Sequence, residues 1–134
     1  QKYKLPPAII DFIEQHHGTS LVYYFYHKAL EKMPEEEIKE EQFRYPGPKP
    51  QTKEVAIVSL ADAVEAATRS LQEPTPARIK GLIKEIINNK FSTGELDECE
   101  LTLKDLNTIA DVFTRICVSI HHARIEYPSE KKQV

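Results

Sequence analysis

The chain has 134 residues with 18 basic and 21 acidic side chains, so its formal charge at pH 7 is −3. This balance argues against a nucleic-acid polymer as a partner. Glycine is scarce, strand-type alternation is nearly absent, and no long apolar run is present, which together predict a soluble all-α protein. The two cysteines, Cys99 and Cys117, are far apart in sequence and are expected to be free thiols in a reducing compartment.

The first predicted helix begins at Pro6 and Pro7, where a missing amide donor costs least. It ends at the adjacent His16 and His17, with Gly18 as the stop signal. Two imidazoles at a helix C-terminus are favourable partners of the helix dipole, but they are also ligands for divalent transition metals. Consecutive side chains diverge by about 100° on a helix, so both reach one ion only if His17 leaves the helical path, which Gly18 permits.

A second helix is expected after Thr19 or Ser20, either of which is a good N-cap, and it fades near Met33. A run of acids follows. Residues 43–50 then contain three prolines and one glycine, which exclude a regular helix there. Because each proline fixes its own backbone angle and restricts its predecessor, this loop is expected to be rigid and able to shape a pocket.

A third helix is predicted from the N-cap Thr52 to about Leu71. Asp62 lies near the edge of its apolar face and is expected to be half sheltered. Such a carboxylate is a candidate metal ligand, but a partly buried helical aspartate is more often bonded to a cap or a base. Arg69, on the same face, makes a structural network a real alternative.

The rest of the chain predicts two more helices. Thr75 caps the first, with Pro76 next to it, and this helix is expected to fray at residues 88–89. Thr102 and Asp105 form a capping-box-like start for the last long helix. Catalysis by a side-chain nucleophile is disfavoured, because no nucleophile elbow, phosphate-binding glycine loop or Cys–base pair is visible. A catalytic role would therefore require a metal that activates water for hydrolysis.

Several motifs in one order resemble a known family. They are His16-His17-Gly18-Thr19, the 43–50 loop, the segment 53–67 that contains Asp62, and the closing Arg124-Ile125-Glu126-Tyr127-Pro128. The whole chain resembles the C-terminal part of the cytoplasmic HD domain of the bacterial seven-transmembrane HD phosphohydrolases, which hydrolyse cyclic di-AMP. The resemblance implies an incomplete HD-like helical bundle over residues 1–128, with the N-terminal helices of the domain absent and 129–134 as a flexible tail.

For the site, the resemblance implies two divalent metal ions, iron or manganese, with His16 and His17 on one and Asp62 on the other. Cyclic dinucleotides offer charge and stacking surfaces. The expected phosphate contacts are Lys53, Arg69 and Arg124, and the expected base or ribose contacts are Tyr45, His122 and Tyr127.

The His-Asp dyad that names the family does not occur in this chain, so the isolated chain is expected to be inactive. The parent protein is expected at the cytoplasmic face of the bacterial membrane. The apolar helix at residues 79–87 and the absent helices favour a homo-oligomer. Two non-catalytic alternatives stay open: a helical nucleotide-sensing module, and an interaction module whose histidines are surface caps.

Overall fold

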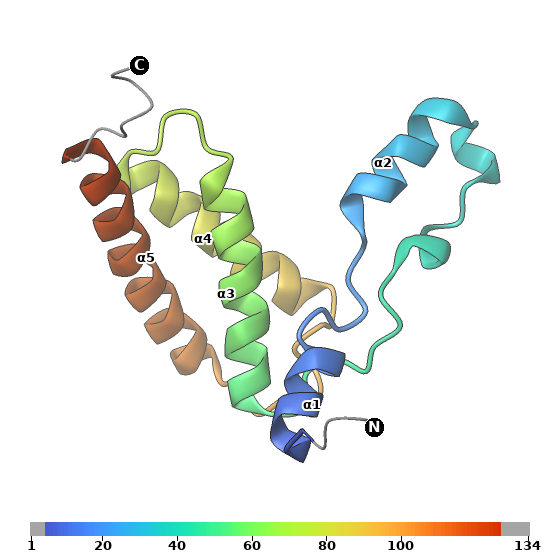
Figure 1. Cartoon of the computed structure of the whole chain (residues 1–134), viewed down its shortest axis with the longest axis horizontal. Coiled ribbons are helices and arrows are strands. Elements are labelled where there is room, and N and C mark those ends of the chain that lie inside the picture. Colours follow the sequence, from blue (N-terminus) through green and yellow to red (C-terminus); the bar gives the residue numbers. More distant parts are fainter. Residues whose placement is uncertain (1–4, 127–134) are drawn as a thin grey trace. The chain divides into compact units, whose positions relative to one another are not determined.

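The structure, a computed structural model, describes residues 5–126, apart from the side chains at 23, 24, 35 and 123–126. Within these residues it is all-helical, as predicted, and its extended pairing is limited to an isolated bridge between Leu21 and Arg44. None of the described helices is both long enough and apolar enough to cross a membrane. The elements, shown in Figure 1, are α1 (Pro7–Gln15), α2 (Tyr23–Lys32), η1 (Glu35–Glu37), η2 (Glu40–Phe43), α3 (Lys53–Arg69), α4 (Pro76–Ser92) and α5 (Leu103–Glu126).

The chain divides into two compact units. Unit 1 contains residues 1–59 and 94–100, and unit 2 contains residues 60–93 and 101–134. The division falls inside α3, between Ser59 and Leu60. Unit 1 therefore holds α1, α2, the proline-rich loop and the first turns of α3, whereas unit 2 is built from the rest of α3 with α4 and α5.

Local capping signals place four helix starts where the sequence predicts them. Pro7 occupies the first turn of α1. The amide of Val55 donates to Thr52 Oγ1 (3.3 Å) at the start of α3, and the amide of Arg78 donates to Thr75 Oγ1 (3.2 Å) at the start of α4. At α5, Thr102 and Asp105 exchange two bonds of 3.0 Å, backbone N–H to side-chain oxygen in each direction, which is the reciprocal pattern of a capping box.

The predicted start of the second helix is wrong, because the two cap candidates make other bonds. Ser20 Oγ donates to the carbonyl of His17 (2.6 Å), and Thr19 Oγ1 donates to the carboxylate of Glu95. The backbone stays extended after Ser20, where Val22 N donates to the carbonyl of Phe43 (2.6 Å). α2 consequently begins only at Tyr23, without a side-chain cap.

The predicted fraying of α4 at residues 88–89 is also wrong. The helix continues to Ser92, whose hydroxyl donates to the carbonyl of Asn88 (2.6 Å), and Thr93 Oγ1 donates to the carbonyl of Asn89 (2.8 Å). Hydroxyl groups of this kind supply bonds to the carbonyls of the last turn, which have no partner within the helix. These local bonds extend the helix past the two asparagines.

Apolar packing holds unit 2 together. α4 packs against α5 (Figure 1), and the helical period of each puts one stripe of aliphatic side chains inside. Fully burying one such side chain stabilises a fold by about 1.5–3 kcal/mol. Because Ile79, Ile83 and Ile87 of α4 are buried, they do not supply an exposed apolar face for a homo-oligomer, which stays a prediction. The buried apolar residues of unit 2 are Leu60, Val64, Ile79, Ile83, Ile87, Leu106, Ile109 and Ala110.

Candidate metal site

The two adjacent histidines lie in a tight turn, here called the histidine turn (residues 16–20), that ends α1. His16 is the C-cap residue, still in a right-handed helical conformation, and its amide donates to the carbonyl of Phe12. Gly18 then takes a positive φ of 55°, which bends the chain away from the helix. As a result the ring centroids of His16 and His17 lie 4.0 Å apart with the planes tilted by 41°. The predicted departure at Gly18 is confirmed.

The ring of His16 is oriented by a backbone carbonyl. Its Nδ1 lies 2.7 Å from the oxygen of Phe12. Because a carbonyl oxygen only accepts hydrogen bonds, Nδ1 carries the proton and donates it. In the neutral imidazole this leaves the lone pair on Nε2, which is the form that binds a metal. A hydrogen bond from the other ring nitrogen to a carbonyl commonly orients such a ligand.

The ring of His17 is oriented by stacking. Tyr45, from the proline-rich loop, lies parallel to it, with ring centroids 4.2 Å apart and an interplanar angle of 9°. Tyr45 N also donates to the carbonyl of Ser20 (2.9 Å), which attaches the loop to the histidine turn. Tyr45 therefore brings this loop against the histidine turn, whereas the prediction that residues 43–50 shape a pocket stays a prediction.

Two buried polar side chains of unit 1, one bonded to the turn and one just before it, accept backbone N–H groups. The carboxylate of Glu95, 5% exposed, accepts from Thr19 N (2.7 Å) and from Thr19 Oγ1. The amide oxygen of Gln15, 7% exposed, accepts from Gln51 N (3.0 Å). Sequence reasoning missed both, because neither belongs to an apolar period and Glu95 lies 76 residues from its partner.

Gly18 is required for a second reason besides its backbone angle. A Cβ atom at this position would lie 2.5 Å from Glu95 Oε1 and 3.3 Å from Pro50 Cδ. The first distance is shorter than real Cβ contacts, and Pro50 is a buried ring that cannot rotate away. Both the conformation of the turn and its close approach to Glu95 therefore depend on the absence of a side chain.

Asp62 lies on α3, and its side chain is exposed, so the expectation of a half-sheltered carboxylate is wrong. Leu60, two residues earlier in α3, is fully buried. Side chains two positions apart on a helix point to different faces, so Asp62 lies off the apolar stripe. Asp62 belongs to unit 2, whereas His16 and His17 belong to unit 1, so its role as a ligand beside them stays a prediction. Two imidazoles and a carboxylate fit iron, manganese and zinc alike, so the donors fit a divalent transition metal without selecting one.

The predicted substrate contacts are spread over the chain. Lys53 is exposed at the first turn of α3 in unit 1, and His122 is exposed on α5 in unit 2. Arg69 donates from Nε to Glu65 Oε1 (3.1 Å) and from Nη2 to Glu65 Oε2, and this bond together with the charge of Glu65 raises the pKa of the guanidinium. The side chain of Arg124 and all of Tyr127 lie outside the described residues.

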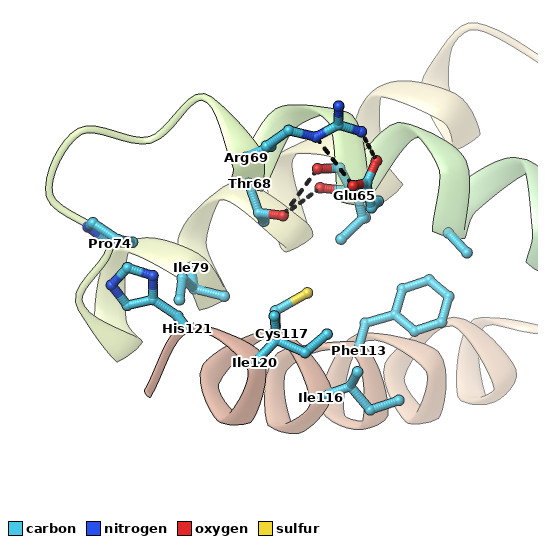
Figure 2. A pocket seen from close by; sticks show the side chains of 12 residues that line it. Glu65, Thr68, Arg69, Pro74, Ile79, Phe113, Ile116, Cys117, Ile120 and His121 are labelled. Carbon is cyan, nitrogen blue, oxygen red and sulfur yellow. Dashed lines mark hydrogen bonds and ion pairs between the residues drawn. The ribbon is translucent and has the colours of Figure 1, made fainter. Parts of the chain in front are cut away.

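Unit 2 also contains a cavity of about 290 Å³. Figure 2 shows the aliphatic and aromatic side chains of α5 on one side of it and the Glu65–Arg69 pair on α3 at its rim. Cys117 lies among them as a free thiol, as predicted, and burial raises its pKa. The lining is mostly apolar and includes Ala61, Val64, Glu65, Thr68, Arg69, Pro74, Ile79, Phe113, Ile116, Cys117, Ile120 and His121.

Comparison with solved structures identifies the class of domain. The chain matches a crystal structure of the Listeria monocytogenes phosphodiesterase PgpH HD domain in complex with cyclic-di-AMP, with 44% identity and a TM-score of 0.82 over 89% of this chain and 55% of that chain. Another crystal structure of the same HD domain matches with 45% identity and a TM-score of 0.80, over 90% and 55% of the two chains. The fold is that of an HD domain, of which this chain spans about half.

Curated sequences specify the relationship further. The chain is 52% identical over its whole length to the cyclic-di-AMP phosphodiesterase PgpH of Bacillus subtilis and 47% identical over 95% of its length to that of L. monocytogenes. It spans only 19% and 17% of these relatives. An uncharacterised protein of Synechocystis is 41% identical over 96% of the chain and 16% of that protein. No protein-family model matches. The chain is thus similar in sequence and fold to part of the HD domain of the PgpH phosphodiesterases.

Proposed function

We propose that this chain is the C-terminal part of a metal-dependent phosphodiesterase domain whose whole protein hydrolyses cyclic di-AMP to a linear dinucleotide. The histidine turn is the observation that carries the proposal, since it holds two imidazoles 4.0 Å apart and leaves His16 Nε2 as the metal-binding nitrogen. The B. subtilis and L. monocytogenes relatives, both named as cyclic-di-AMP phosphodiesterases, support the choice of substrate.

In this proposal His16 and His17 bind one divalent ion and Asp62 binds the other, with iron or manganese as the metals. When bound, the two ions would supply an activated water and stabilise the charge that develops on the phosphate. The chain's own part is to orient the imidazoles. The carbonyl of Phe12 does this for His16, and the ring of Tyr45 does it for His17.

The substrate contacts follow from charge and stacking. Lys53, Arg69 and Arg124 are proposed for the phosphates. Arg69 would exchange Glu65 for a phosphate, which costs little because the side chains of this pair are 65% and 58% exposed and ion pairs of this kind are weak in water. Tyr45, His122 and Tyr127 are proposed for the bases or riboses.

The isolated chain is proposed to be inactive, because two imidazoles and one carboxylate leave a two-metal centre without a full ligand set. The remaining ligands would come from a His-Asp dyad upstream of Gln1 in the whole protein. That protein is proposed to act at the cytoplasmic face of the bacterial membrane. The isolated chain is proposed to form a homo-oligomer, which light scattering of the purified chain tests directly.

The proposal is tested in the whole protein, with hydrolysis of cyclic di-AMP measured by chromatography of the linear product. His17→Ala should reduce the rate by at least two orders of magnitude, as expected when an essential catalytic group is removed. His27→Ala, which replaces an exposed histidine on α2, is the matched control and should leave the rate unchanged. Binding of cyclic di-AMP without any linear product in the wild-type protein would favour the sensing module instead.

A further inference from the structure

We infer that Glu95 is a positioning residue for the metal-binding histidines: its buried carboxylate fixes Thr19 and thereby sets the path of the histidine turn. The inference rests on the proposed function, because that function makes the histidine turn a metal-binding element. Glu95 is joined to the turn by its hydrogen bonds to Thr19. It acts through the backbone that connects Thr19 to His17.

The two oxygens of Glu95 have separate partners on one residue. Oε1 accepts from the backbone amide of Thr19 (2.7 Å), and Oε2 accepts from its hydroxyl. Burying a carboxylate is costly unless hydrogen bonds compensate it, and bonds to an ionised acceptor are stronger than neutral ones. Moving Thr19 would leave this buried charge without either bond, so the position of Thr19 is strongly determined.

The position of Thr19 determines that of His17. Only Gly18 separates them. Its φ is 55°, and Glu95 Oε1 lies against the position where a Cβ atom of residue 18 would be. The next residue, Ser20, returns a bond from its hydroxyl to the carbonyl of His17 (2.6 Å). The backbone is therefore fixed on both sides of Gly18, and the ring of His17 is held against His16 and Tyr45.

Substitutions at both ends of the contact separate positioning from general stability. Glu95→Gln keeps the shape and one acceptor oxygen, Glu95→Ala removes both bonds, and Thr19→Val removes the hydroxyl donor alone. Thr19→Ser keeps both donors and serves as the conservative rescue. Glu100→Gln, at an exposed acid of the same loop, is the matched control.

The first measurement needs no metal. Imidazole signals of His16 and His17 are recorded by NMR in the folded 134-residue chain, where the Tyr45 ring stacked on His17 gives a distinctive ring-current shift. We expect Glu95→Ala and Thr19→Val to remove much of that shift, and Thr19→Ser and Glu100→Gln to retain it. Glu95→Gln should show a ring-current shift of intermediate size. It replaces Glu95→Ala in the comparison if that variant does not fold.

The second measurement is calorimetric titration of the same variants with Mn²⁺. Loss of a supporting residue around a metal typically weakens binding by about 10- to 100-fold, which is the range expected for Glu95→Ala. Unchanged ring signals in both Glu95→Gln and Thr19→Val would overturn the inference. Absence of Mn²⁺ binding by the wild-type chain would instead count against the proposed function, while the ring signals would still decide the role of Glu95.

Discussion

The histidine turn in unit 1 and the helices of unit 2 are held by different kinds of interaction. Around the turn, the decisive contacts are polar. They come from Glu95 in a loop and from Gln15 at the end of α1, both of which are buried and accept backbone N–H groups. In unit 2 the decisive contacts are apolar and come from periodic positions such as Ile79, Ile83 and Ile87. Polar bonds are directional and apolar burial is not, so the first region is suited to fixing ligand geometry and the second to supplying stability.

The largest expected effect is on stability, from unit 2. Ile83 is fully buried in α4, and Ile83→Ala should lower the free energy of unfolding by about 2–5 kcal/mol through lost burial and the cavity left behind. Ile13→Ala, at a site 59% exposed on α1, is the control and should change it far less. Urea unfolding followed by circular dichroism measures both. Similar losses at the two sites would break the comparison.

A smaller loss is expected at the turn itself. Gly18→Ala forces an alanine into a positive φ and against Glu95, which should cost about 1–3 kcal/mol and displace the His17 ring signals. Gly81 is the control, since it lies inside α4 with open space where a Cβ would be, and Gly81→Ala should stabilise the chain by about 0.5–1 kcal/mol. Opposite signs at the two glycines would confirm that the turn requires a residue without a side chain and that the helix does not. The same sign at both would contradict it.

The smallest effect concerns the pH dependence of unit 2. Burial raises the pKa of the Cys117 thiol in the folded chain, so the folded state holds this proton more tightly than the unfolded state. Its contribution to stability is complete below the ordinary thiol pKa of 9.0 and is lost as pH rises through the higher folded value. As the pH is raised above 9.0, the urea concentration at the unfolding midpoint should decrease slightly for the wild type and for Cys99→Ala, and should decrease less for Cys117→Ala. An identical pH dependence of stability in all three proteins would contradict the attribution of this effect to Cys117.

Sequence reasoning recovers what local interactions decide. Thr52, Thr75 and Thr102 are caps because their partners lie three residues away, and Gly18 is recognisable as the break that brings two neighbouring histidines together. The resemblance to HD phosphohydrolases, drawn from ordered motifs, agrees with the solved HD domains.

Sequence reasoning fails where a distant residue competes for a local group. Thr19 looks like a helix cap, but Glu95 takes its hydroxyl, and α2 starts later as a result. No periodicity links these two residues, so their bond could not be predicted from the chain alone. The prediction for the exposure of Asp62 fails for a related reason, because the burial of a position at the edge of an apolar stripe depends on which distant segments pack beside it.

The central claim, that the histidine turn is a preformed pair of metal ligands, is tested most directly by titrating the 134-residue chain with Mn²⁺ in a calorimeter. The wild-type chain and His27→Ala should bind with equal affinity, whereas His16→Ala and His17→Ala should each weaken binding by at least about tenfold, a loss of roughly 1.4 kcal/mol. Equal affinities in all four chains, or no binding by the wild type, would contradict the claim.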